Sequence, residues 1–547
     1  MRRLSCTAPV LRRAALQSLA AAVVVAAPLG AQDHDHPAGD ASRLGRVTFE
    51  VSCSEVVQPQ FERAVAMLHS FWFASAHAAF TAIMEADPDC AMAHWGVALT
   101  MMGNPMTRAT PDAAALKEGA AAVARAAALR AGATHREQMY IDAAAAYYAD
   151  HETRDHLARM QSHEQALAAV HEAHPEDMEA AIFHARTIVA NASPADKTFA
   201  AQLRGASILQ PLFDAHPQHP GLAHYLIHAY DAPQLADRAT KAAFAYADIA
   251  PDAPHALHMP SHIFTRLGYW DESIETNARS ARAEPDSNAA VHPLDYMVYA
   301  YLQQGRDDDA RRVVERITRI DDSFYGGLLG YNFTAMPARY AIERGAWSEA
   351  AALTLPTGAT PYVQALSHFA RAIGAARSGD AAAAGADVAE LGRLKAALAA
   401  ANDSYWATVV EAQRLAAAAW VARAEGDDMR AVQLARQAAD LEETVEKHPV
   451  TPGPLLPARE LEGDLLLELG RAADALAAYT RTLEREPRRA RALFGAARAA
   501  EQAGNAATAA ARYRELIELM EKADPSRSEV QAARAYLDAG ARSGDRE

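Results

Sequence analysis

The segments HYLIHAY at 224–230 and HMPSHIF at 258–264 each carry two histidines four residues apart, and they lie 34 residues from each other. The second segment therefore repeats the histidine pair of the first. A third segment, 37 residues further along, has Asp295 and Tyr299 at the matching places. A period of about 34 residues is typical of stacked helical hairpins. The spacing predicts that polar side chains recur on one face of successive helices.

The rest of the sequence also favours helical hairpins. From Phe61 onward apolar residues recur at helical spacing, and no run of residues predicts a strand. Glycines interrupt this pattern where a first helix must turn into a second. Such a turn needs a left-handed backbone conformation, which glycine adopts at little cost in free energy. These glycines are Gly268, Gly305, Gly345, Gly379, Gly426, Gly470 and Gly504. The predicted fold is all-α, a right-handed superhelical solenoid of antiparallel helix hairpins.

The chain divides into five predicted segments. Basic residues, a short apolar run and the small residues Gly30 and Ala31 are typical of a secretory signal, and the apolar run is too short for a membrane span. The segments are a signal peptide at 1–31, a flexible leader at 32–50, the solenoid at 51–447, a Pro-rich connection at 448–458, and C-terminal hairpins with a capping helix at 459–547. The repeat register within 110–200 stays unassigned. We expect an exported protein, periplasmic or secreted.

The charge of the chain limits its partners. The 547 residues carry a formal charge of −16, and removal of the signal takes away four arginines, which gives −20. Nucleic acids and anionic membranes bind basic patches, so this acidity argues against both as partners. We expect a protein, peptide or small-molecule ligand instead.

Two of the three cysteines, Cys53 and Cys90, remain after the signal is removed. In an oxidising compartment they can form a disulfide, which would stabilise the first hairpin by ~3–4 kcal/mol. The alternative is two buried free thiols. We expect the disulfide, because exported proteins seldom keep two spare thiols.

Several longer segments carry a family resemblance. They are VSCS at 51–54, DPDCAMAHWG at 87–96, HYLIHAY at 224–230, PHALHMPSHIF at 254–264 and PGPLLPARE at 452–460. With them the chain resembles exported bacterial tetratricopeptide-repeat proteins that have a His-rich central segment. The resemblance covers nearly the whole mature chain and implies a repeat fold, but no established activity. In tetratricopeptide repeats generally, the second, fifth and ninth positions of each first helix face a concave groove.

Those groove positions define the candidate site. Spacings of three and four residues keep each set of side chains on one face of its helix. The predicted groove residues are His224, His228, His255, His258, His262, His292, Asp295, Tyr299, Trp95 and Arg339. The leading hypothesis is an exported scaffold, not an enzyme, that binds a peptide, protein or small ligand in this His-lined groove.

A transition-metal site is the alternative. Two His-x-x-x-His pairs, His224 with His228 and His258 with His262, would hold Zn²⁺ or Cu²⁺ together with Asp295, and a metalloenzyme would then be conceivable. Pro260 leaves the local geometry open, since it either kinks one helix or begins a new one and leaves His255 and His258 in the preceding loop. We find no phosphate loop, nucleophile elbow or His-Glu-x-x-His motif.

Overall fold

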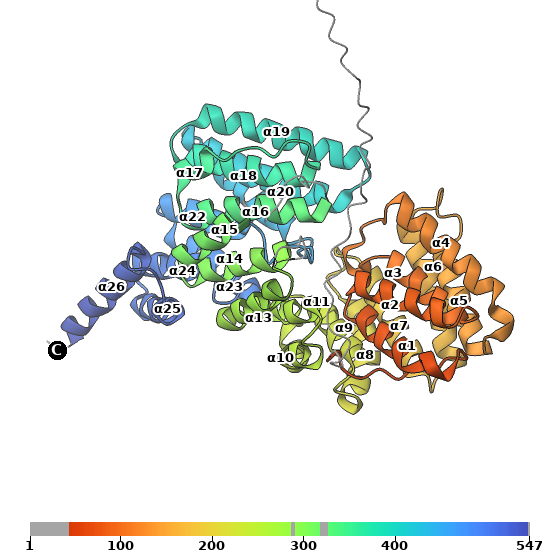
Figure 1. Ribbon diagram of the computed structural model, residues 1–547. Coiled ribbons are helices and arrows are strands. Elements are labelled where there is room, and N and C mark those ends of the chain that lie inside the picture. Colours follow the sequence, from red (N-terminus) through yellow and green to blue (C-terminus); the bar gives the residue numbers. More distant parts are fainter. Residues whose placement is uncertain (1–42, 286–289, 318–326, 545–547) are drawn as a thin grey trace, which may run out of the picture. The chain divides into compact units, whose positions relative to one another are not determined.

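The computed structural model describes residues 43–285, 290–317 and 327–544. Within these ranges the regular structure is helical throughout and contains no strand, as the sequence predicted (Figure 1). The predicted signal peptide at 1–31 and residues 32–42 of the predicted leader lie outside the described residues. Nowhere in the described ranges is a helix both long and apolar enough to cross a membrane.

The helices follow one another with short connections. Up to the centre of the chain they are α1 (Gln58–His69), α2 (Phe73–Ala86), α3 (Ala91–Met101), α4 (Ala113–Ala128), α5 (His135–Tyr148), α6 (His156–Ala173), α7 (Met178–Asn191), α8 (Ala200–Ala215), α9 (Pro220–Tyr230), α10 (Thr240–Ile249), α11 (Pro254–His258), α12 (Pro260–Leu267) and α13 (Trp270–Ala283). Short 3₁₀ turns are η1 (Glu55–Val57), η2 (Pro105–Thr107), η3 (Arg130–Gly132) and η4 (Ala236–Ala239).

The second half continues in the same way. Its helices are α14 (Val291–Gln303), α15 (Asp307–Ile317), α16 (Gly327–Glu343), α17 (Trp347–Ala351), α18 (Pro361–Arg377), α19 (Ala381–Ala400), α20 (Ser404–Ala424), α21 (Asp428–Glu442), α22 (Ala458–Glu468), α23 (Ala472–Arg485), α24 (Ala490–Gln502), α25 (Ala506–Leu519) and α26 (Ser528–Gly544).

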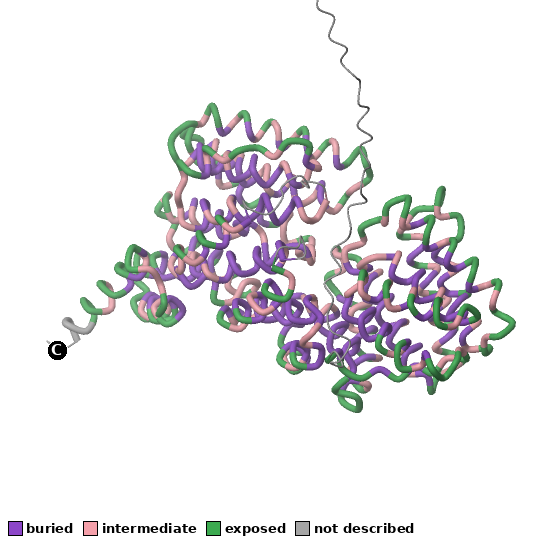
Figure 2. The backbone as a smooth tube through the Cα atoms, in the orientation of Figure 1, coloured by how far each residue is buried: buried purple, intermediate pink, exposed green. Residues whose placement is uncertain are grey.

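The helices pack as stacked hairpins. Each helix contacts the next one in the chain, and alternate helices also touch, as α14 does with α16, α18 with α20 and α22 with α24. Buried residues line the contacts between helices, while exposed residues gather at the outer turns (Figure 2). This contact pattern is that of a tetratricopeptide-type helical solenoid, in which each hairpin buries its apolar face against its neighbours.

The predicted hairpin turns are confirmed. All seven glycines singled out from the sequence adopt a positive φ, for example 69° at Gly305 and 74° at Gly504. Gly305 lies between α14 and α15, and Gly504 lies between α24 and α25. A side chain at such a φ is strained, so glycine allows two helices to follow each other within very few residues.

Residues 43–50 correct one expectation. The sequence placed them in a flexible leader, but Phe49 is buried and packs edge-on against Phe61 and Trp95, with ring centroids 5.6 and 5.7 Å away. Leu44 and Val47 are buried as well. The prediction was wrong because three apolar residues at uneven spacing form no pattern that distinguishes a buried segment from a solvated tail.

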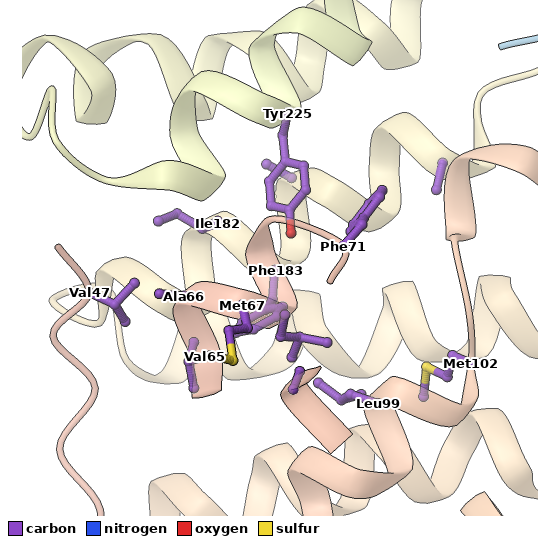
Figure 3. Packing of buried hydrophobic residues seen from close by; sticks show 14 of the residues in the cluster. Val47, Val65, Ala66, Met67, Phe71, Leu99, Met102, Ile182, Phe183 and Tyr225 are labelled. Atoms are coloured by element: carbon purple, nitrogen blue, oxygen red, sulfur yellow. The ribbon is translucent and has the colours of Figure 1, made fainter. Parts of the chain in front are cut away.

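The N-terminal helices enclose a large apolar core. Figure 3 shows Phe71, Phe183 and Tyr225 packed near Val65 and Met67 in this cluster. The core extends from Leu44 to Phe264, and it includes residues of α9, α11 and α12, which carry the central histidines. A rigid, close-packed support of this kind holds the side chains above it in defined rotamers.

Cys53 and Cys90 form a disulfide in the structure, with their sulfur atoms 2.02 Å apart. Cys53 precedes η1, and Cys90 is the residue before α3. The bond ties the segment that enters the first helix to the start of the second hairpin.

The connection between α21 and α22 crosses over the central helices. Tyr296 donates a hydrogen bond to the carbonyl oxygen of Thr451 (3.1 Å), and Asn332 donates to that of Val450 (2.9 Å). Arg339 donates to the carbonyl oxygens of Gly453 and Pro454 at 3.2 and 2.9 Å. Because its carbonyl groups are paired in this way, the connection is fixed against α14 and α16.

Candidate functional site

Six histidines from four helices meet beneath this connection. They form two groups of three, and within each group the nitrogen atoms that could bind a metal lie within 4.8 Å of one another. The first triad is His224 and His228 on α9 with His255 on α11. The second triad is His258 on α11, His262 on α12 and His292 on α14.

Three prolines mark where the helices α9, α11 and α12, which carry five of these histidines, begin. Pro220, Pro254 and Pro260 each stand at the first position of a helix, where the missing N–H is not needed and the fixed φ suits the first turn. Of the two geometries that the sequence left open at Pro260, the chain adopts a new helix. However, His255 and His258 lie on a short helix of their own rather than in a loop.

The first triad is centred on His224. The Nε2 atom of His224 lies 3.1 Å from that of His228 and 3.2 Å from that of His255. Its Nδ1 atom is 2.6 Å from the carbonyl oxygen of His69. A carbonyl oxygen can only accept, so Nδ1 of His224 carries the proton and its Nε2 presents a lone pair to the other two rings.

The second triad repeats this arrangement. The Nε2 atoms of His258 and His262 are 3.0 Å apart. His258 donates from Nδ1 to Oδ1 of Asn277 (2.6 Å), and His262 donates from Nδ1 to Oδ2 of Asp231 (2.9 Å). The His292 ring lies 4.4 Å from that of His258, and its buried Nδ1 atom has no hydrogen-bond partner among the described residues.

The second triad needs a cation. His258 and His262 both donate from Nδ1, so their Nε2 lone pairs face each other at 3.0 Å and repel unless a proton or a metal ion lies between them. In the first triad only His224 has its tautomer fixed, so a neutral His228 or His255 can also donate from Nε2 to it. Two imidazoles bound to one tetrahedral ion at ~2.0–2.1 Å have their nitrogen atoms about 3.3–3.4 Å apart. The observed separations are therefore close to those of ligands around a common ion.

Protonated rings explain the cluster less well. Burial, and then the neighbouring histidines, lowers the pKa of five of these six imidazoles well below the ordinary value of 6.5. The sixth pKa, that of His262, is also lowered by burial, against the effect of Asp231. The environment thus favours neutral imidazole, which is the form that binds metals.

Asp231 orients the second triad. Besides the bond from His262, it accepts from Nε of Arg266 (2.8 Å) and from Nζ of Lys447 (2.9 Å). Burial raises the pKa of this carboxyl group, but Lys447 and Arg266 outweigh that effect and hold it well below 3.8. A carboxylate that accepts from the second ring nitrogen fixes the tautomer and direction of a metal-binding histidine.

Four predicted groove residues do not join the cluster. Trp95, Asp295, Tyr299 and Arg339 are buried, each with at most 1% of its surface exposed. Trp95 belongs to the N-terminal core, Asp295 contacts Arg339, and Tyr299 accepts a hydrogen bond from Arg489. The prediction of one open groove lined by all ten residues is therefore wrong: three of the six histidines are buried and three half-buried.

Besides Asp231, the sequence interpretation missed Tyr296. It follows His262 by 34 residues, just as His292 follows His258. Its ring lies 5.0 Å from that of His258 and 5.1 Å from that of His262. The 34-residue period therefore continues into α14, and the spacing of 37 selected Asp295 and Tyr299, nearly one helical turn too far along.

A third buried group supports the first triad. Glu179 pairs with Nε2 of His69 and with Nε2 of His219, both at 2.8 Å, and Nδ1 of His69 lies 3.0 Å from the hydroxyl group of Tyr225. These hydrogen bonds fix His69, whose carbonyl oxygen in turn orients His224. The carboxylate satisfies one nitrogen of each ring, while the buried Nδ1 atom of His219 has no hydrogen-bond partner among the described residues.

A cavity of about 620 Å³ adjoins the first triad. Its lining includes His228, Asp231, Lys447, Arg108, Tyr362 and Trp406. A volume of this size accommodates a small organic molecule or a group of water molecules. The cluster thus adjoins a chamber whose walls carry aromatic side chains, cations and the carboxylates of Asp231, Asp403 and Glu446.

Comparison with known families identifies the C-terminal hairpins. The tetratricopeptide repeat family matches residues 461–528. Within this range the ring of Tyr479 fills the space beside Gly463 and Gly495, where an added Cβ atom would lie within 2.9 and 2.3 Å of it. This protein therefore contains tetratricopeptide repeats, as the resemblance of its sequence implied.

Two further comparisons were made. A search of curated proteins gave no match. Among solved structures, one match is a monomeric mutant of IFIT1 with Gppp-AAAA; it has 11% sequence identity and a TM-score of 0.39, and the alignment covers 78% of this chain and 90% of that chain. A likeness at this level carries no information on ligands.

Proposed function

We propose that this helical repeat protein binds transition metal ions at its six-histidine cluster. The observation that carries the proposal is the convergence of Nε2 atoms at 3.0–3.2 Å in both triads, and above all the two facing lone pairs of His258 and His262. Hydrogen bonds from the opposite ring nitrogen hold His224, His258 and His262 in the required tautomer. Imidazole ligands suit zinc and copper, which are the ions we propose.

This proposal takes up the alternative that the sequence left open. The leading hypothesis, a scaffold that binds a peptide or small ligand in a His-lined groove, requires rings that a peptide can reach. The burial of His224, His258 and His262 supports a metal instead. That the protein binds no nucleic acid stays a prediction from its acidity.

We also propose that the protein is exported. The support is the signal-like segment at 1–31 together with the Cys53–Cys90 disulfide, since such bonds persist mainly in oxidising compartments.

Elemental analysis tests the metal proposal. Residues 32–547, produced without a histidine tag, loaded with zinc or copper and dialysed without chelator, should retain at least about one mole of metal per mole of chain. His258→Ala should lose metal, because it removes a ligand and opens the second triad. His135→Ala is the matched control, since His135 is exposed and outside both triads.

Circular dichroism of each variant shows whether the helices remain. Less than about one-tenth mole of metal in the folded wild-type protein contradicts the proposal. Equal metal content in His258→Ala and His135→Ala places the metal elsewhere and contradicts it too.

A further inference from the structure

We infer that the cluster binds two ions as a pair, one in each triad, and that the pair takes one small anion as a bridging ligand. This inference rests on the proposed function and goes beyond it, because a metal-binding cluster could equally hold a single ion.

The number of nitrogen atoms is too large for one ion. Zinc bound by protein side chains is almost always four-coordinate, and a site with three protein ligands keeps one position open. The cluster offers six imidazoles, arranged as two separate groups of three. Each triad therefore supplies one ion with three ligands and leaves it one open position.

The two triads are in direct contact. The ring of His228 in the first triad lies 6.0 Å from that of His262 in the second. The rings of His255 and His258, three residues apart on α11, are also 6.0 Å apart. In two-metal sites one small ligand fills both open positions when the ions lie about 3.5–4 Å apart, and the proposed pair has this arrangement.

The charge of the site favours an anion as this ligand. The described ligand atoms of both triads are neutral imidazole nitrogens, with no carboxylate among them. Asp231 is the carboxylate nearest to the second triad, and it already pairs with Lys447 and Arg266. Two ions would thus bring uncompensated positive charge into a buried place, and a bridging anion reduces that charge.

The cavity gives this ligand an approach. It reaches His228 of the first triad, and Arg108 and Lys447 are in its walls. Asp231, Asp403 and Glu446 also line it, so its walls carry both signs of charge and the preference for an anion comes from the two ions themselves. The class of ligand is therefore a small anion with two donor positions, such as hydroxide, for which azide is a probe.

Copper titration with electron paramagnetic resonance tests the pair. Wild-type protein should bind two Cu²⁺ ions per chain, one for each triad. The second equivalent should convert the spectrum of isolated Cu²⁺ into that of an interacting pair, with a half-field transition or loss of signal. Azide, followed by its charge-transfer absorption, should bind once per pair of ions.

Single variants separate the two sites. His255→Ala in the first triad and His292→Ala in the second should each bind one Cu²⁺ ion with an ordinary isolated spectrum, while the His135→Ala control keeps the pair. The wild-type titration needs no variant, so misfolding of one variant leaves the test intact. The inference of an ion pair would be overturned if the wild-type chain binds only one Cu²⁺ ion, or if two bound ions give isolated spectra. It would also be overturned if azide binds once per ion. In each of these cases the proposed metal-binding function would stand. Failure to bind copper or zinc at all would overturn the proposed function itself.

Discussion

Replacement of Glu460 with alanine is expected to lower the free energy of unfolding by about 3–5 kcal/mol. Glu460 is fully buried and accepts from Nε and Nη2 of Arg489 at 2.6 and 3.1 Å. Arg489 is equally buried and also contacts Glu343 (2.8 Å) and the hydroxyl group of Tyr299 (3.0 Å). Arg489 has two carboxylate partners, Glu343 and Glu460, and loss of Glu460 leaves it with only one of them in the interior, where no water takes the place of the other. Urea denaturation followed by circular dichroism measures the change.

An exposed ion pair provides the control. Asp309→Ala removes a partner of Arg312, which is 63% exposed, and of the half-buried Arg306, and should change stability by about 1 kcal/mol or less. A double replacement, Glu460→Met with Arg489→Met, should recover only part of the loss, because it removes these two buried charges but leaves the buried Glu343 without Arg489. If Glu460→Ala costs no more than Asp309→Ala, the buried pair does not join the C-terminal hairpins to α14 and α16.

Metal loading is expected to give the second large effect. A ligand that binds only the folded protein stabilises it by about 2.7 kcal/mol per site when its free concentration is 100 times its dissociation constant. The two triads together should therefore add about 5 kcal/mol and raise the unfolding temperature, and a chelator should reverse the shift. Differential scanning calorimetry of the same preparation with and without zinc measures it.

Two comparisons isolate the cause of that shift. Magnesium should leave the unfolding temperature unchanged, because it prefers oxygen ligands and keeps its water molecules. In His262→Ala the response to zinc should fall to about half, since one triad is lost. An equal response to magnesium, or an unchanged response in His262→Ala, would mean that the stabilisation arises outside the cluster.

The helical repeat could be predicted well from the sequence because it depends on local rules. Glycines at fixed intervals, such as Gly305 and Gly504, mark turns that few other residues allow, and both have the predicted left-handed conformation. Phe49 shows the limit of such rules. Its burial against Trp95 depends on the assembly of distant helices, which no local pattern records.

The candidate site was predictable only in part. The 34-residue period brings His224, His258 and His292 into neighbouring helices, and continuing it without change would also have indicated Tyr296. The tautomers could not be predicted, because they depend on contacts far away in the chain. His224, for instance, is oriented by the carbonyl oxygen of His69, 155 residues earlier.

The prediction of an open groove was wrong for a related reason, because it also depends on a contact with a distant part of the chain. Positions that face the concave side in a regular repeat array can be covered when another segment crosses that side. Here the connection before α22 binds Arg339 through the carbonyl oxygens of Gly453 and Pro454 and buries it. A repeat register alone does not predict such a cover.

The most direct test of the central claim is an anomalous difference map from crystals of zinc-loaded protein, with data collected at the zinc absorption edge. We predict one peak inside each triad, about 2.0–2.1 Å from the Nε2 atoms of His224, His228 and His255 in the first and of His258 and His262 in the second. Zinc peaks only at surface carboxylates, with the six imidazoles still facing one another unbridged, would contradict a metal site in this cluster.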